Sequence, residues 1–129
     1  MKAAILDPRV LAAKNRGGGI RTVPLVTSRI GSTSLLNGVT TLDPGAAVPL
    51  HIHNCEESVL VMSGRGRVHI DGVETDVEPG VTTWIPTGVQ HFFRNTSATE
   101  PMSIFWTYAS IDANRTIVAT GVTTRIDEE

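Results

Sequence analysis

Short runs of alternating apolar and polar residues follow one another along most of the chain, from residue 20 to residue 119. A period of two is typical of β-strands, and β-branched residues are frequent in these runs. Clusters of Gly, Pro, Asp and Ser, which favour turns, separate the runs. The pattern predicts strands over about 20–26, 32–42, 48–53, 57–62, 67–70, 73–77, 82–85, 91–94, 102–108 and 115–119.

The segment before residue 20 has a different pattern. Asp7 is suited to cap a helix, Pro8 is suited to its first position, and the glycines at 17–19 would end it. We therefore expect a short helix or turn in an N-terminal arm that covers residues 1–19. A chain of 129 residues favours one core, so residues 20–129 are predicted to form a single β domain.

Closely spaced short strands must hide their edges, which favours a closed barrel or a double-sheet jelly roll. One face of the strand at 102–108 is apolar throughout, and we expect this face to line the barrel. It carries Met102, Ile104, Trp106 and Tyr108. In the strand at 57–62 both faces are apolar. A second subunit or the N-terminal segment is therefore expected to cover its outer face.

Composition and charge narrow the function classes. The formal net charge is -2 and charged residues make up 19%, so a nucleic-acid interface is not indicated. The only cysteine is Cys55, which excludes an intrachain disulfide and a zinc site built from cysteines, and favours a reducing, cytoplasmic setting. No apolar run is long enough for a signal peptide or a membrane span, so we expect no membrane association.

Three histidines and a glutamate are the candidate site. His51 and His53 have strand spacing, so both imidazoles emerge on one face, and Glu57 has the parity to point the same way. His91 opens a later strand. Such a mixed N/O set suits one divalent Fe, Mn, Ni, Cu, Co or Zn ion, with open positions left for a substrate. The residues alone leave two interpretations open, a metal site and a set of core histidines.

The spacing around these residues resembles the two sequence motifs of the cupin superfamily. In the first, Gly45 is followed by five residues, His51-x-His53, three residues, Glu57, six residues and Gly64. In the second, Gly80 is followed by five residues, Pro86-x-Gly88, two residues, His91, three residues and Asn95. The 15 residues between Gly64 and Gly80 resemble the spacing of small single-domain microbial cupins.

The resemblance implies an all-β, double-stranded β-helix (jelly-roll) barrel with a metal near its mouth. By motif position, His51, His53, Glu57 and His91 would be the metal ligands. The family contains dioxygenases, isomerases, lyases and binding domains without activity, so the fold does not choose the function. Small members are mostly homodimers, and the doubly apolar strand at 57–62 agrees with a homodimer here.

Other residues receive weaker assignments. Phe93, Trp106 and Tyr108 are candidates for the wall of a small-molecule pocket. An inward arginine would select a carboxylate, but the sequence does not say which arginine points inward. The candidates are Arg21, Arg29, Arg65, Arg67, Arg94 and Arg115. Asn95 is expected to be structural, Cys55 to be a small residue in a tight turn, His69 to face solvent, and Trp84 to belong to the core or an interface.

Two functions compete. The first is an enzyme that acts on a small metabolite through the metal, with dioxygenase chemistry favoured over isomerase or lyase chemistry because no second acid or base is evident. The second is a module that binds or senses a small ligand without turnover.

Overall fold

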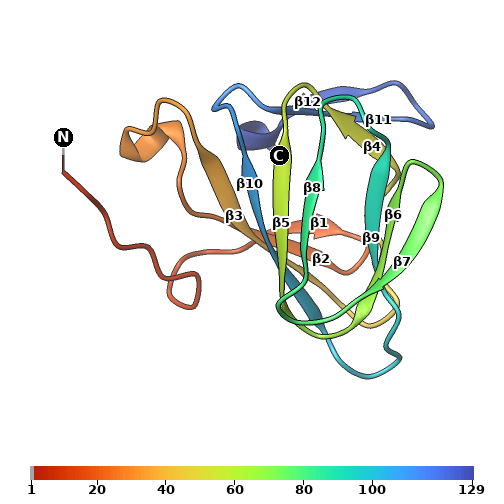
Figure 1. Ribbon diagram of the computed structural model, residues 1–129. Helices are drawn as coiled ribbons and strands as arrows, with labels where there is room; N and C mark the ends of the chain where they lie inside the picture. The colour runs from red at the N-terminus through yellow and green to blue at the C-terminus, as the bar shows by residue number, and fades with distance from the viewer. Residues whose placement is uncertain (1) are drawn as a thin grey trace.

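The computed structural model describes residues 2–129, and these residues form two six-stranded antiparallel sheets that face each other as a barrel (Figure 1). The strand order is β1-β2-β3-β10-β5-β8 in one sheet and β12-β11-β4-β9-β6-β7 in the other. The all-β prediction is confirmed. The strands are β1 (Lys14–Gly17), β2 (Ile20–Pro24), β3 (Leu36–Leu42), β4 (His51–His53), β5 (Glu57–Ser63), β6 (Gly66–Ile70), β7 (Val73–Val77), β8 (Thr82–Ile85), β9 (His91–Asn95), β10 (Met102–Tyr108), β11 (Asn114–Ile117) and β12 (Thr123–Arg125).

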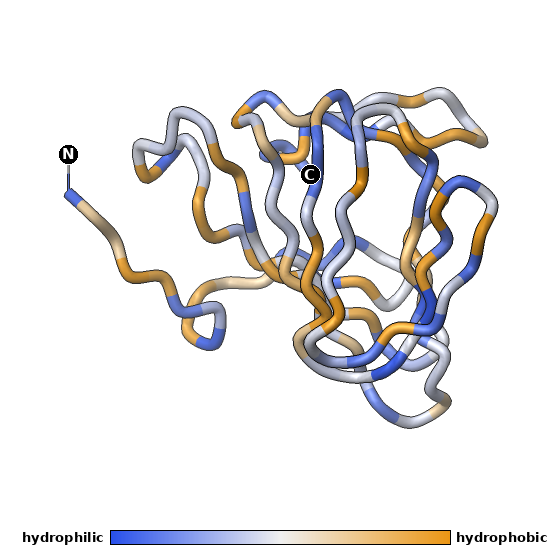
Figure 2. Tube along the Cα trace, viewed as in Figure 1, coloured by the Kyte–Doolittle hydropathy of each residue, from blue (hydrophilic) through white to orange (hydrophobic). Residues whose placement is uncertain are grey.

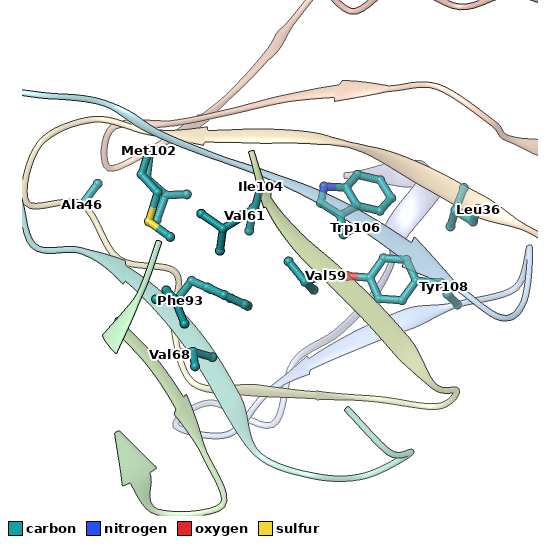
Figure 3. Close-up of a cluster of buried hydrophobic side chains, with 13 residues drawn as sticks. Leu36, Ala46, Val59, Val61, Val68, Phe93, Met102, Ile104, Trp106 and Tyr108 are labelled. Carbon is teal, nitrogen blue, oxygen red and sulfur yellow. The ribbon is translucent and has the colours of Figure 1, made fainter. Parts of the chain in front are cut away.

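The core lies between the two sheets, where every second residue of each central strand points inward (Figure 3). The apolar face of β10 is buried as predicted, from Met102 to Tyr108. Val59 and Val61 of β5 pack beside it, and Phe93 and Val68 complete the cluster from the opposite sheet. Each large side chain buried in this way stabilises the fold by about 1.5–3 kcal/mol.

The outer face of β5 is exposed in the single chain. Leu60 and Met62 are 37% and 45% exposed, and the neighbouring Trp84 of β8 is 65% exposed. Trp84 is therefore not a core residue, and its Nε1 donates a hydrogen bond to Glu56. The N-terminal segment runs away from the barrel instead of covering this face (Figure 1). A second subunit as its cover remains a prediction.

The N-terminal arm contains a turn, not a helix. Asp7 accepts a hydrogen bond from the backbone N–H of Arg9, as expected of a cap, and the backbone N–H of Val10 donates to the carbonyl of Asp7. The turn goes no further because a short helix without packing partners is marginal in water, and apolar residues here remain exposed outside the barrel (Figure 2). Met1, the first residue of the predicted arm, lies outside the described residues.

The arm ends in a strand that the sequence pattern did not predict. β1 pairs with β2 across the glycines that were expected only to end a helix. β3 starts later than predicted because a 3-10 turn, η1 (Ser28–Ile30), precedes it. The second and final 3-10 turn among residues 2–129 is η2 (Ile126–Glu128) at the C-terminus. Within residues 2–129, no helix has the length and apolar character needed to cross a membrane.

Asn95 has the structural role that was predicted. Its side chain is buried at the end of β9, and its Nδ2 lies 2.8–3.2 Å from the carbonyl oxygens of Leu42, Asp43 and Glu100. Its Oδ1 accepts a hydrogen bond from the backbone N–H of Ser97. One side chain therefore links the end of β3, in the opposite sheet, to the loop that leads into β10.

Candidate metal centre and cavity

The four predicted ligands come from both sheets. His51 and His53, two positions apart on β4, both point inward. His91, the first residue of β9, is the cross-strand partner of His51. Glu57 reaches the same place from β5 in the facing sheet. All four side chains are buried. The barrel therefore brings together residues that are up to 40 positions apart in the sequence.

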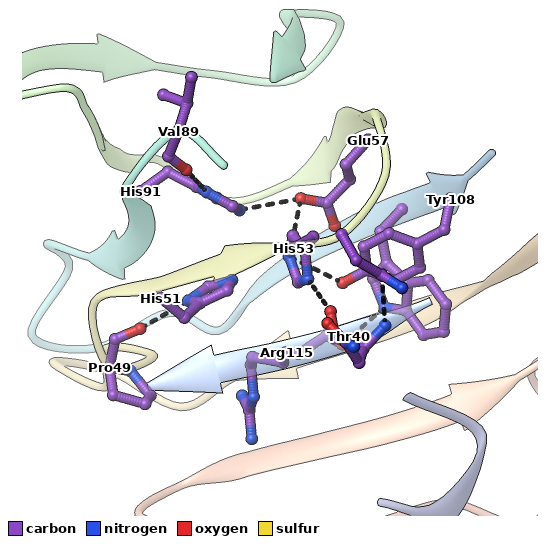
Figure 4. A network of polar contacts seen from close by, with 12 residues as sticks. Thr40, Pro49, His51, His53, Glu57, Val89, His91, Tyr108 and Arg115 are labelled. Carbon is purple, nitrogen blue, oxygen red and sulfur yellow. Dashed lines mark hydrogen bonds and ion pairs between the residues drawn. The ribbon is translucent and has the colours of Figure 1, made fainter. Parts of the chain in front are cut away.

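The three imidazoles form one compact group (Figure 4). Their ring centroids are 4.3–5.0 Å apart, and one ligand atom from each ring lies within 4.8 Å of the others. Glu57 closes the group on one side, with its Oε1 3.0 Å from Nε2 of His91 and 3.5 Å from Nε2 of His53.

The backbone fixes the orientation of every ring. Nδ1 of His51 lies 2.6 Å from the carbonyl of Pro49, Nδ1 of His53 lies 2.8 Å from that of Asn114, and Nδ1 of His91 lies 2.9 Å from that of Val89. A carbonyl accepts only, so each Nδ1 carries the hydrogen of a neutral ring. Each Nε2 is then left with a free lone pair, which is the form in which histidine binds a metal.

The electrostatics of the group favour a cation among these atoms. Burial, together with the charges that His91 and His53 can carry, lowers the pKa of His51 from 6.5 to about 3. Burial alone raises the pKa of Glu57, but the close approach of His53 and His91, which favours the ionised carboxylate, outweighs it and lowers that pKa to about 2. The centre thus combines an ionised carboxylate with an imidazole that resists protonation.

This donor set fits a divalent transition metal. With Nδ1 protonated on each ring, the Nε2 lone pairs and the Glu57 oxygens are all acceptors, and buried acceptors that face each other repel unless a proton or a cation lies between them. Imidazole nitrogens with one carboxylate suit Fe, Mn, Co, Ni, Cu and Zn. His51, His53, His91 and Glu57 could hold such an ion, and the donor set does not select one metal.

Tyr108 places a proton donor beside the ligand set. Its hydroxyl lies 3.3 Å from Nε2 of His53, and its ring packs edge-on against that imidazole at 4.6 Å. Burial raises the pKa of Tyr108 well above its ordinary value, and the negative charge of Glu57 raises it further. The phenol therefore stays neutral and can donate a hydrogen bond. The sequence placed Tyr108 near a pocket but not at the ligands.

The centre opens into a cavity of about 950 Å³ that His51, Glu57 and His91 line. The predicted pocket residues Phe93, Trp106 and Tyr108 line it as well. Trp106 is held in place because its Nε1 donates to Oγ1 of Thr40, which in turn lies 3.0 Å from Oγ1 of Thr22. A cavity in which a fixed aromatic wall faces polar groups that can orient a ligand is typical of a small-molecule site.

The other residues singled out in the sequence differ in whether they line the cavity. Cys55 packs against the core, where burial raises the pKa of its thiol, and it does not line the cavity. His69 stacks on Phe92 outside the histidine group. Among the arginines, Arg115 and Arg29 line the cavity, whereas Arg21, Arg65 and Arg67 form exposed ion pairs.

Arg16 and Glu129 are among the cavity residues that the sequence analysis missed. Arg16 lies in the predicted N-terminal arm, and Glu129 is residue 129 of the sequence. Both line the cavity next to Arg115. No local pattern marks either residue, because they meet only through contacts between distant parts of the chain.

The two-sheet barrel and the buried histidine group are the features expected of a cupin. The family model of the Cupin domain matches residues 38–108, more than half of the chain, so the protein belongs to this family. The match covers β3 to β10 and includes all four predicted ligands.

Two curated relatives come from Streptomyces. Protein SchB of Streptomyces halstedii is 36% identical over 93 residues, which covers 71% of this chain and 67% of SchB. Polyketide synthase CurC of Streptomyces cyaneus is 33% identical over 107 residues, which covers 78% of this chain and 69% of CurC.

Solved cupin structures share the fold. The polyketide cyclase RemF from Streptomyces resistomycificus superposes with a TM-score of 0.77 at 16% identity, over 97% of this chain and 86% of RemF. An RmlC-like cupin from Shewanella frigidimarina superposes with a TM-score of 0.74 at 19% identity, over 84% of this chain and 92% of that one. At these identities the likeness concerns the fold alone.

Proposed function

We propose that this cupin is a metal-dependent enzyme that closes a ring in a small polycarbonyl substrate of the polyketide type. The observation that carries the proposal is the position of Tyr108: a neutral, buried hydroxyl lies beside the histidine and glutamate group, which opens into a large cavity. The names of CurC and RemF, a polyketide synthase and a polyketide cyclase, point to the same substrate class.

The chemistry required is redox-neutral. In an aldol closure, a carbon next to one carbonyl loses a proton and forms a bond to a second carbonyl carbon, whose oxygen takes up that proton and becomes a hydroxyl group. This hydroxyl group and a second hydrogen from the newly bonded carbon then leave as water, and a C=C bond forms. A divalent ion held by the four ligands would polarise carbonyl oxygens and so make the neighbouring C–H bonds more acidic. Tyr108 donates a hydrogen bond to the oxygen on which negative charge develops.

The cavity walls contribute by orientation and by excluding water. Phe93 and Trp106 offer flat apolar surfaces on which a chain of carbonyl groups can fold into a ring-forming conformation. Trp106 holds its orientation through its hydrogen bond to Thr40. A substrate that fills the cavity would displace water and so strengthen the hydrogen bond from Tyr108, because the local dielectric constant would fall.

Dioxygenase chemistry is the second candidate. The same three imidazoles and carboxylate suit ferrous iron and leave open positions where dioxygen could bind. The sequence favoured this reaction because no acid or base was evident beside the ligands. Since the Tyr108 hydroxyl lies 3.3 Å from His53, that reason is weaker and ring closure becomes the preferred proposal.

The test compares both reactions on one probe, the linear triketone heptane-2,4,6-trione. Aldol closure of this triketone and loss of water give orcinol. Zinc-loaded and ferrous protein are each incubated with the triketone while orcinol and dissolved oxygen are measured. We expect orcinol without oxygen consumption, and a rate lower by about tenfold or more in Tyr108→Phe. The double variant His51→Ala, His91→Ala with the same added metal gives the background.

Other outcomes would replace the proposal. Oxygen uptake that depends on the triketone, without orcinol, would support a dioxygenase. Tight binding of the probe with neither reaction would support the module that binds a ligand without turnover.

We also propose that the protein is a homodimer that covers the outer face of β5. Leu60, Met62 and Trp84 expose apolar and aromatic surface there, and Met and aromatic residues are enriched at the buried centre of interfaces. Light scattering behind a sizing column would give the mass of a dimer for the natural sequence and of a monomer for Leu60→Glu. A monomeric natural sequence would contradict this proposal.

A further inference from the structure

Basic side chains from opposite ends of the sequence meet in the cavity wall. Nη2 of Arg16 lies 2.6 Å from Oε2 of Glu129, and Nε of Arg115 lies 2.9 Å from its Oε1. Nζ of Lys14 donates a hydrogen bond to the main-chain oxygen of Glu129. Lys14, Arg16, Arg115 and Glu129 all line the same cavity as the histidine group.

These contacts differ from the other arginine–carboxylate pairs of residues 2–129. The Glu129 side chain is only 6% exposed, and those of Arg16 and Arg115 are 18% and 19% exposed. In the other pairs every arginine is at least 41% exposed and every carboxylate at least 21%. A buried ion pair seldom adds net stability, because removing two charges from water costs about as much as their attraction returns. Stability is therefore a weak reason for this cluster.

The fit between Arg115 and Glu129 is also incomplete. Nε of Arg115 and Oε1 of Glu129 are both buried and lie close together, yet no well-directed hydrogen bond satisfies either atom. Buried polar atoms nearly always have such a partner, so exceptions need an explanation. The carboxylate of a free ligand can rotate into line with Nε of Arg115. It would therefore form a better hydrogen bond than the side chain of Glu129, whose position is restricted by β12 and η2.

The cluster is close enough to the metal centre to contact one bound molecule together with it. Arg115 of β11 is the cross-strand partner of His53 on β4 (Figure 4). The charges of Glu129 and Arg115 both influence Tyr108: burial is the main cause of its raised pKa, Glu129 adds to the rise and Arg115 opposes it.

We propose that Arg16 and Arg115 form a carboxylate-binding site in the cavity wall, which the acid group of the substrate enters by displacing the side chain of Glu129. This inference rests on the proposed function, because it names the substrate class of the same cavity. Two guanidinium groups share the side-chain carboxylate of Glu129, and planar guanidinium groups bind planar carboxylates with directed hydrogen bonds. The rest of the ligand is apolar, in keeping with Phe93 and Trp106.

Benzoate and benzamide are the probes, since they share shape and ring but differ in charge. Titration calorimetry is performed on protein stripped of metal with a chelator, so that benzoate has no ion to bind. We expect benzoate to bind about tenfold more tightly to Glu129→Gln than to the natural sequence, because the competing carboxylate is gone. Arg115→Gln and Arg16→Gln should each weaken benzoate binding by about tenfold.

Two controls separate charge recognition from general effects. Arg21→Gln removes an exposed arginine that pairs with Asp43, and benzoate binding should be unchanged. Benzamide should bind all variants alike. If Arg115→Gln does not fold, Glu129→Gln and Arg16→Gln still decide the question.

Three results would overturn the inference: equal affinity for benzoate and benzamide, equal benzoate affinity in the natural sequence and Glu129→Gln, or no benzoate binding to Glu129→Gln at millimolar concentration. Because the titrations use stripped protein, they can succeed even if metal analysis and the triketone assay contradict the proposed function. They can also fail while those two measurements succeed.

Discussion

The buried imidazole of His51 should make the metal-free protein less stable in acid. The pKa of His51 is about 3 in the folded chain, whereas that of an ordinary histidine is 6.5. Below pH 6.5 this residue is therefore protonated in the unfolded chain while it is still neutral in the folded chain. The free energy of unfolding is therefore unaffected by this group above pH 6.5 and falls as the pH is lowered toward 3. Between about pH 7 and about pH 4.5 the loss amounts to about 2.5 kcal/mol.

Glu57 affects a different pH range. Its pKa falls from 4.5 to about 2 on folding, so its contribution is present above 4.5 and is lost as the pH drops toward 2. The window from about pH 7 to about pH 4.5 therefore reports mainly on His51 rather than Glu57.

Urea unfolding followed by circular dichroism, with a chelator present, measures this loss at the two ends of the window. We expect the natural sequence to lose about 2.5 kcal/mol more than His51→Gln over the same pH change, each chain being compared with its own stability at about pH 7. Equal losses in the two chains would refute the argument, because the imidazole of His51 would then titrate in the folded state as it does in the unfolded chain.

Two further predictions concern the scaffold. Asn95→Ala should destabilise the fold by about 3 kcal/mol, since it leaves buried carbonyl groups without a donor. The control Asn54→Ala, at an exposed site, should cost less than about 1 kcal/mol. Urea unfolding would measure both free energies, and equal losses would argue against the role of Asn95. A Cβ at Gly38 would lie 2.6 Å from both the Trp106 ring and the carbonyl of Val23. Gly38→Ala should therefore cost about 1–3 kcal/mol and shift the tryptophan fluorescence, and an unchanged spectrum would contradict this.

Local sequence signals predicted most of the barrel because its strands are bounded by turns with distinct chemistry. Asp71 and Gly72 are an example: both adopt positive φ values, 49° and 82°, and they join β6 to β7 as the predicted hairpin. The edge strands β1 and β12 were missed because neither has an apolar alternating pattern. Their pairing depends on a neighbouring strand that already belongs to a sheet.

The candidate metal ligands could be anticipated because their spacing reflects the barrel itself. His51 and His53 share a face by strand geometry, and the motif positions of Glu57 and His91 bring the facing sheet and the next strand to the same point. The contact between Arg16 and Glu129 spans 113 positions and has no such regularity. Such a contact becomes visible only when the ends of the chain are placed in space.

Metal content tests the central claim most directly, that His51, His53, Glu57 and His91 hold a divalent ion. The protein would be purified anaerobically without a metal-affinity tag and analysed by mass spectrometry for transition metals. The double variant His51→Ala, His91→Ala and the control His69→Ala, which changes the one histidine outside the group, would be treated alike. We predict close to one metal ion per chain in the natural sequence and in His69→Ala, and loss of that metal in the double variant. A natural sequence that carries no metal and binds none on titration would contradict the account.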